Sequence, residues 1–103
     1  MGRAGETIAA AYLSERGVKI LARNLTVGSG ELDIVGTVGG RRVAFEVRTV
    51  TGDRDPLDAF DPGKYDRVWR LARHARCSRV DLVAVGIGPL VAEVRWVPSV
   101  HRG

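Results

Sequence analysis

The sequence has only one cysteine, Cys77, and it lacks a long uninterrupted apolar run. A single cysteine excludes an intramolecular disulfide framework, so we expect a reducing compartment, the cytoplasm. The longest apolar region, VDLVAVGIGPLVAEV, is cut by Asp81, by glycine and proline and by Glu93. It is therefore no candidate for a membrane span, which needs about 20 apolar residues. The opening MGRAGE has no hydrophobic signal-peptide core.

The rest of the composition is that of a small basic globular domain. Of 103 residues, 45% are hydrophobic and 27% are charged, which predicts a single domain over residues 1–103. The net charge is +4, and nearly all basic residues are arginine. Such a balance suits a polyanionic partner such as nucleic acid. An arginine-rich composition without any such partner is the alternative interpretation.

Hydrophobic periodicity and turn residues predict seven elements in the order α-β-β-β-α-β-β. They are a helix over 3–16 stopped by Gly17, strands over 18–27, 31–38 and 41–50, a polar loop over 51–63, a helix from 62 to about 76 and strands over 80–87 and 90–97. Asp61-Pro62 is a strong start for the second helix, with Asp61 as N-cap. A strand, a crossover helix and another strand imply a parallel pair inside a mixed sheet.

The second predicted helix has two distinct faces. Its apolar stripe consists of Tyr65, Val68, Trp69, Ala72 and Ala75. Arg67, Arg70 and Arg73 lie on the far face. The strand that follows, VDLVAVGI, is almost continuously apolar, which is typical of a central strand covered on both sides.

A hairpin over residues 30–48 carries an unusual set of charges. Gly39-Gly40 between two alternating runs predicts a two-residue loop, because both positions can take positive φ. Counting back from that loop places Asp33 opposite Glu46 and Glu31 opposite Arg48, all four on one face. The other face carries the side chains that we expect in the core: Leu32, Ile34, Val43, Phe45 and Val47.

Two opposed carboxylates repel each other unless a proton or a cation lies between them. A divalent metal would suit Asp33 and Glu46, because Mg²⁺ takes one or two carboxylates together with waters and phosphate oxygens. The alternative is a solvated charged face on which Arg48 neutralises Glu31 and Glu46.

Other titratable residues carry weaker signals. Glu6 faces an apolar stripe of the first helix, where a carboxylate needs a cation or hydrogen-bond donors. It is equally a first-turn glutamate that favours the helix dipole. Cys77, His74 and His101 show no metal-ligand spacing.

A set of ordered motifs covers nearly the whole chain: GRAGE…A…YL over 2–13, ILARN over 20–24, GELDIV over 30–35, FEVRT over 45–49, Lys64, and RVDLVAV over 79–85. In these motifs the chain resembles the YraN family of small bacterial proteins, which is placed in the restriction-endonuclease-like PD-(D/E)XK superfamily. The family is in turn similar to the archaeal Holliday-junction resolvases.

The resemblance implies a restriction-endonuclease-like α/β fold, a mixed central sheet flanked by helices, with a Mg²⁺ or Mn²⁺ site on the central hairpin. Asp33 would match the metal-binding aspartate, Glu46 its acidic partner and Glu6 the carboxylate of the first helix. The carbonyl of Val47 would be a further ligand. Arg48 stands where the superfamily has lysine.

That departure bears on catalysis, because arginine stabilises charge but cannot give up a proton near neutral pH. Lys64 is a candidate substitute for the missing lysine, or else a surface lysine in a first helical turn. Three hypotheses follow: a metal-dependent nuclease, with branched DNA among its substrates; a non-catalytic nucleic-acid-binding module; and a protein-interaction domain. The resolvase resemblance also suggests a homodimer.

Overall fold

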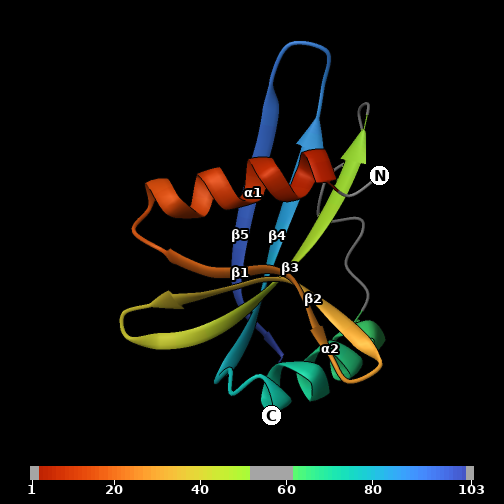
Figure 1. The fold of residues 1–103 in the computed structure, drawn as a ribbon. Coiled ribbons are helices and arrows are strands. Elements are labelled where there is room, and N and C mark those ends of the chain that lie inside the picture. Colours follow the sequence, from red (N-terminus) through yellow and green to blue (C-terminus); the bar gives the residue numbers. More distant parts are fainter. Residues whose placement is uncertain (1–2, 52–61, 102–103) are drawn as a thin grey trace.

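Two helices and five strands follow one another in the predicted order α-β-β-β-α-β-β (Figure 1). The computed structural model describes residues 3–51 and 62–101, apart from the side chains of residues 3, 62, 64, 100 and 101. The elements are α1 (Arg3–Glu15), β1 (Lys19–Val27), β2 (Gly30–Val38), β3 (Arg41–Thr51), α2 (Pro62–His74), β4 (Arg79–Ile87) and β5 (Ala92–His101). The predicted N-cap Asp61 and most of the predicted 51–63 loop lie outside the described residues.

The five strands form one mixed sheet in chain order, β1-β2-β3-β4-β5. Neighbouring strands are antiparallel except β3 and β4, which are parallel and are connected through α2. The expected parallel pair inside a mixed sheet is therefore confirmed. Its strand β4 is buried along most of its length, as the apolar run VDLVAVGI predicted.

The helices cover opposite faces of the sheet, so that the protein has two apolar layers (Figure 1). Ala9 and Leu13 of α1 pack on Ile34 of β2, on Phe45 of β3 and on further apolar side chains of β3 and β4. The α2 face is built from Tyr65, Val68 and Ala72 against residues of β2, β3 and β4. The expected sheet flanked by helices is confirmed, and the predicted apolar stripe of α2 faces the sheet.

Both helices end in the same hydrogen-bonded motif. After α1, the Val18 N–H donates to the Leu13 carbonyl at 3.0 Å and the Gly17 N–H donates to Ser14 at 3.1 Å, with Gly17 at φ +89°. This is a Schellman motif, and it explains why Gly17 stops the helix as predicted. After α2 the equivalent left-handed residue is Arg76, at φ +64°.

The loop of the β2–β3 hairpin is the predicted one. Gly39 and Gly40 have φ values of +55° and +81°, which a two-residue hairpin of this kind requires. The register runs as counted from Val38, opposite Arg41, to Ile34, opposite Phe45.

The start of β5 differs from the prediction. Leu90 and Val91 belong to the β4–β5 turn, where the Gly88 N–H donates to the Val91 carbonyl at 2.9 Å, and the strand begins at Ala92. Their side chains are 93% and 75% exposed at the tip of a hairpin that extends beyond the other strands (Figure 1). The strand also runs on through Pro98, which an edge strand tolerates because it needs no outward donor.

Both outer strands of the described sheet are irregular. In β1 the register shifts between Ile20 and Ala22, and Asn24 has a left-handed φ of +53°. In β5 the residue after Pro98, Ser99, has a φ of +56°.

Within the described part of the chain, no helix has the length and hydropathy to cross a bilayer.

Candidate active site

The candidate site lies where β2 and β3 part. Their ladder ends at the pair Ile34–Phe45. Beyond that pair β2 continues along β1, while β3 continues along β4, with Glu46 opposite Leu82. Asp33 and Glu46 are the first residues past the end of the ladder, so they lie at the opening of the hairpin rather than within a paired stretch.

Asp33 holds the two strands together at this opening. Its side chain is half-buried, and its Oδ2 accepts a hydrogen bond of 2.8 Å from the backbone N–H of Val47. The carboxylate thus takes the place of a main-chain acceptor that β2 no longer supplies. This bond fixes Asp33 against the backbone of β3, immediately beside Glu46.

Glu46 is a buried carboxylate with a cation beside it. Only 6% of the residue is exposed, and its Oε1 lies 2.8 Å from Nη2 of Arg48. The two groups form an ion pair, although the Arg48 N–H bond does not point along the line of a hydrogen bond. Because such a charge is costly to bury, this cation stabilises Glu46 inside the protein.

The hydroxyl of Tyr65, from the first turns of α2, faces the same group of charges. Burial raises the pKa of Tyr65 to about 12. This pKa already includes the positive charge of Arg48, which lowers it, and the negative charges of Glu46 and Asp33, which raise it. The phenol therefore stays protonated beside the carboxylates at physiological pH.

Two expectations for this hairpin are wrong. Glu31 does not lie opposite Arg48: it pairs with Thr26 of β1, and Arg48 lies beside Ala84 of β4. Leu32 is buried as expected, but it packs in the layer under α2, whereas Ile34 packs under α1. Both errors have one cause, because the simple hairpin register was extended past the point where the strands part.

Glu6 is connected to a different partner, Asn24 of β1. The amide of Asn24 lies between acceptors, so its NH₂ group is assigned to face them and donates to Glu6 Oε1 at 2.7 Å and to Glu31 Oε1 at 3.2 Å. Gly5 packs closely against Thr49 of β3, which brings the first turn of α1 over the parting strands. Glu6 is buried there, with 7% of the residue exposed.

The structure brings together only some of the predicted site residues. Asp33, Glu46, Val47 and Arg48 form one cluster, while Glu6 joins Asn24 and Glu31. Among the described residues, no group of three or more His, Cys, Asp or Glu side chains is arranged to hold a metal ion. The side chain of Lys64 lies outside the described residues, although its backbone belongs to the first turn of α2.

Cys77 and His74, which showed no metal-ligand spacing in the sequence, lie elsewhere. Cys77 is buried in the α2 layer, and this burial raises the pKa of its thiol. His74 is exposed, as expected for the polar face of α2. Neither residue belongs to a described metal-binding group.

Sequence reasoning assigned no role to two residues at the site, Asn24 and Tyr65. Asn24 carried a usable signal, because asparagine is rare inside strands and common in left-handed backbone. Tyr65 was placed correctly on the apolar stripe of α2, but nothing in the sequence indicated that the charges of Arg48 and Glu46 act on its hydroxyl.

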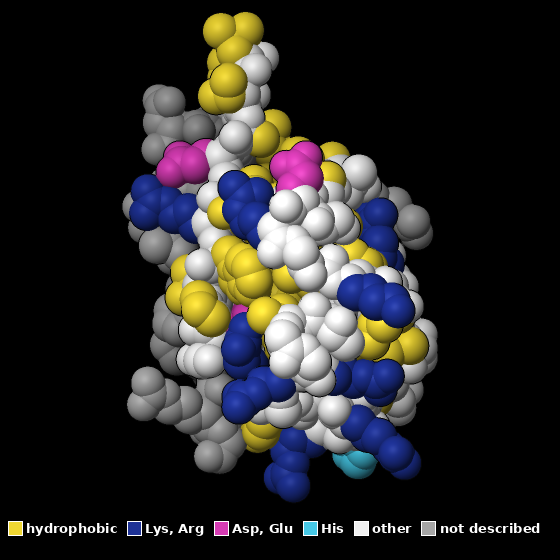
Figure 2. All heavy atoms as spheres, turned by 90° about the vertical axis from the view of Figure 1, so that its left-hand side faces the viewer, with side chains coloured by type: hydrophobic (Ala, Val, Ile, Leu, Met, Phe, Trp, Pro, Cys, Tyr) yellow, Lys and Arg dark blue, Asp and Glu magenta, His cyan; other side chains and the backbone are white. Residues whose placement is uncertain are grey.

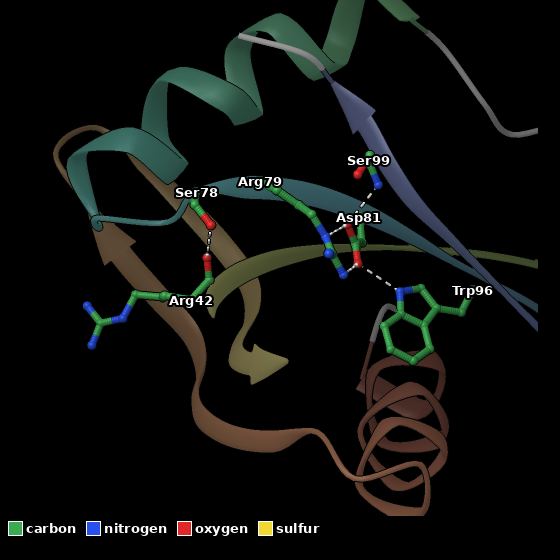
Figure 3. Close-up of polar contacts among 6 residues, drawn as sticks. All are labelled: Arg42, Ser78, Arg79, Asp81, Trp96 and Ser99. Atoms are coloured by element: carbon green, nitrogen blue, oxygen red, sulfur yellow. Dashed lines mark hydrogen bonds and ion pairs between the residues drawn. The ribbon is translucent and has the colours of Figure 1, made fainter. Parts of the chain in front are cut away.

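A third buried carboxylate, Asp81 of β4, has a structural role. It receives two hydrogen bonds from Arg79, at 2.8 and 3.0 Å, one from Trp96 Nε1 at 2.8 Å and one from the Ser99 N–H at 2.8 Å (Figure 3). All its partners lie on β4 and β5. Asp81 therefore fastens the edge strand β5 to the sheet.

Comparisons with known proteins agree with the sequence motifs. Residues 5–95 match the model of "Uncharacterised protein family UPF0102". A UPF0102 protein of Arthrobacter sp. (strain FB24) is 38% identical over 111 residues, covering 94% of each chain. One from Symbiobacterium thermophilum is 42% identical over 99 residues, covering 86% of this chain and 84% of its own.

A solved structure, the crystal structure of SSO0001, resembles this fold with a TM-score of 0.50 and 13% sequence identity. The match covers 95% of this chain, which spans half the length of that one. At this identity the likeness concerns the fold alone. The family match and the relatives settle the assignment: the chain belongs to family UPF0102, the YraN family.

Proposed function

We propose that this protein is a metal-dependent nuclease whose site lies at the parting of β2 and β3. One observation carries the proposal: Asp33 and the buried Glu46 follow the last pair of the ladder side by side, with the backbone of Val47 beside them. Proteins seldom bury a carboxylate next to another one without a use for it.

The donor atoms at this place suit Mg²⁺ or Mn²⁺. Two carboxylates and the Val47 carbonyl supply oxygen ligands, which these cations prefer. Mg²⁺ in phosphate chemistry commonly takes only one or two carboxylates and keeps several waters, so the site needs no third acidic side chain. When bound, the cation would neutralise charge on the scissile phosphate and lower the pKa of the attacking water.

Each side chain then has a definite part. The hydrogen bond from Val47 keeps Asp33 oriented, and the other oxygen, Oδ1, is left to serve as a ligand. Arg48, which lies against Glu46, would stabilise charge that develops at phosphorus. Glu6, held through Asn24, would add negative charge near the first turn of α1.

A second function is favoured by one observation, the contact between Arg48 and Glu46. A cation from the protein already neutralises the buried carboxylate. In a non-catalytic nucleic-acid-binding module the fold and the basic surface would remain, and Arg48 would occupy the place of the metal charge.

Cleavage assays separate the two functions. We expect Mn²⁺-dependent hydrolysis of at least one substrate among branched, single-stranded and duplex DNA and RNA. Glu46→Gln should abolish it, because this variant keeps the shape of the side chain and removes the charge. Equal activity in both proteins would indicate a contaminant and would leave the nuclease proposal without support.

Calorimetric titration with Mn²⁺ tests the metal site directly. Asp33→Asn is the suitable variant, because its amide oxygen can still accept the bond from Val47 while the charge is lost. We expect clear heats for the wild type and at least tenfold weaker binding for Asp33→Asn. Equal binding by the two proteins, or none by either, would refute the site.

A further inference from the structure

The outer face of α2 carries a row of basic side chains. Arg67, Arg70, Arg73 and His74 are all exposed there, and we call these four residues the α2 arginine face. Successive arginines are three residues apart, so they form a slanting ridge on one side of the helix. Arg42, whose Nη1 donates to the Ala75 carbonyl at 3.1 Å, adds a further cation at the C-terminal end of α2.

Within the described structure, no acidic side chain forms an ion pair with these cations. None of the described ion pairs Arg48–Glu46, Arg79–Asp81 and Arg95–Glu93 includes an arginine of this face. The helix dipole favours Arg73 and His74, which lie in the last turn. It gives no such benefit to Arg67, in the first half of the helix.

The surface of this face is also hollowed. Arg70, Arg73 and His74 line an open hollow of about 390 Å³, enough for a phosphate group with its waters. Figure 2 shows Lys and Arg side chains over much of this face, and they extend across its lower half, the end at which α2 lies in Figure 1. The larger acidic patches of that view stand in the upper half.

The position of α2 relates this surface to the candidate active site. Its inner face carries Tyr65, whose hydroxyl is close enough to Arg48 and Glu46 for their charges to act on it. From Tyr65 to Arg73 the helix rises by about 12 Å, which corresponds to three or four nucleotides along one strand of a duplex. A strand bound along the arginines would therefore lie within a few nucleotides of the carboxylates.

We propose that the α2 arginine face binds the phosphate backbone of the nucleic acid that the candidate site acts on. The direction of the strand, from the carboxylates along α2, rests on the proposed nuclease function. The binding itself rests on the exposed arginines, which no described acid neutralises, and on the hollow between them. Contacts of this kind hold the backbone without reading base sequence.

The experiment compares two triple variants by fluorescence anisotropy with a short labelled DNA duplex over a range of salt concentrations. The test variant is Arg67→Gln, Arg70→Gln and Arg73→Gln, since glutamine has nearly the helix propensity of arginine. The control is Arg16→Gln, Lys19→Gln and Arg95→Gln, three exposed residues on other elements. Both variants lose three positive charges, so a difference between them reports position and not net charge.

We expect the test variant to bind roughly tenfold or more weakly than the wild type. We plot the logarithm of the association constant against the logarithm of the salt concentration. This negative slope should become less steep by about 0.9 for each phosphate that the variant no longer neutralises. The control variant should stay near the wild type in both affinity and salt dependence. Equal losses in the two variants, or no binding by the wild type at low salt, would overturn the proposal. Circular dichroism shows whether the triple variant is folded. If it is not, the single variant Arg70→Gln provides the binding measurement.

The same proteins separate this proposal from the nuclease proposal. Duplex binding and Mn²⁺-dependent cleavage are both measured on the wild type, the α2 triple variant and Glu46→Gln. Binding that depends on α2 without any cleavage would support the arginine face and refute the nuclease. Cleavage that depends on Glu46 but is unchanged in the α2 variant would support the nuclease and refute the arginine face.

Discussion

Replacement of Arg48 distinguishes a catalytic arginine from one that only neutralises Glu46. Nη2 of Arg48 lies 2.8 Å from Oε1 of Glu46, and the two side chains are 22% and 8% exposed. The informative changes are Arg48→Ala, which removes the cation, and Arg48→Lys, which keeps it and restores the usual superfamily pattern.

The cost to stability follows from the burial of the pair. Removal of one partner from a fully buried ion pair costs about 3–5 kcal/mol, because a charge stays behind in the protein. Arg48 is partly exposed, and Glu46 has a further interaction, so we expect about 2 kcal/mol for Arg48→Ala. Arg48→Lys should cost less. Urea denaturation at neutral pH measures both.

The effect on cleavage is larger if Arg48 contacts the reacting phosphate. Removing one charged group that stabilises a developing oxyanion costs roughly 3 kcal/mol, or about a hundredfold in rate. Arg48→Ala should then cleave about a hundredfold more slowly in Mn²⁺, whereas Arg48→Lys should keep or raise the rate. Rates are compared at temperatures where denaturation shows both variants folded.

One pattern would refute a catalytic role. If Arg48→Ala and Arg48→Lys cleave as fast as the wild type while only the stability changes, Arg48 neutralises Glu46 and nothing more. If neither the wild type nor Arg48→Lys cleaves any substrate, the result contradicts the nuclease proposal and favours the non-catalytic binding module.

Three further predictions concern stability. The pKa of Tyr65 rises from 10.0 to about 12 on folding, so its contribution is complete below pH 10 and is lost as the pH rises towards 12. For the wild type, this loss of free energy of unfolding should be on the order of 2 kcal/mol, as measured by urea denaturation across that pH range. Tyr65→Phe should not show this loss, and an equal loss in the variant would contradict the raised pKa of Tyr65. Arg76→Gly should raise the free energy of unfolding by about 1 kcal/mol, since glycine adopts the φ of +64° without a clash; a lower melting temperature would speak against strain. Asp81→Asn should cost about 3–5 kcal/mol, because its NH₂ group would meet the donors that now surround the carboxylate. The exposed Glu93→Gln is its control, with an expected change below about 0.5 kcal/mol, and equal losses in the two variants would refute the role of Asp81.

Local signals in the sequence predicted most of the fold. Gly17 and Gly39-Gly40 occupy left-handed positions that few other residues tolerate, so they marked a helix end and a hairpin loop correctly. The apolar run of β4 and the two-faced pattern of α2 were sufficient to place the crossover. In each case the determinants lie within a few residues of the feature that they determine.

The details of the candidate site were less accessible, because they depend on contacts between distant segments. The β2–β3 ladder ends where the Val47 N–H bonds to the side chain of Asp33, and no turn signal marks this place. Counting from Gly39-Gly40 gave the correct register as far as Ile34 and Phe45, then failed at Glu31 and Arg48. The pair Asp33 and Glu46 was identified because it is the first one past the last regular pair.

The irregular outer strands limit how two copies of this protein can associate. A regular edge strand presents free N–H and C=O groups to which another chain can add as a further strand. Along β1 this row is interrupted by the shift after Ile20 and by the left-handed Asn24, and along β5 by Pro98 and Ser99. The described edges therefore leave one uninterrupted stretch, Ala92–Val97 of β5, for strand addition between two copies, and the exposed apolar tip at Leu90 and Val91 adjoins it.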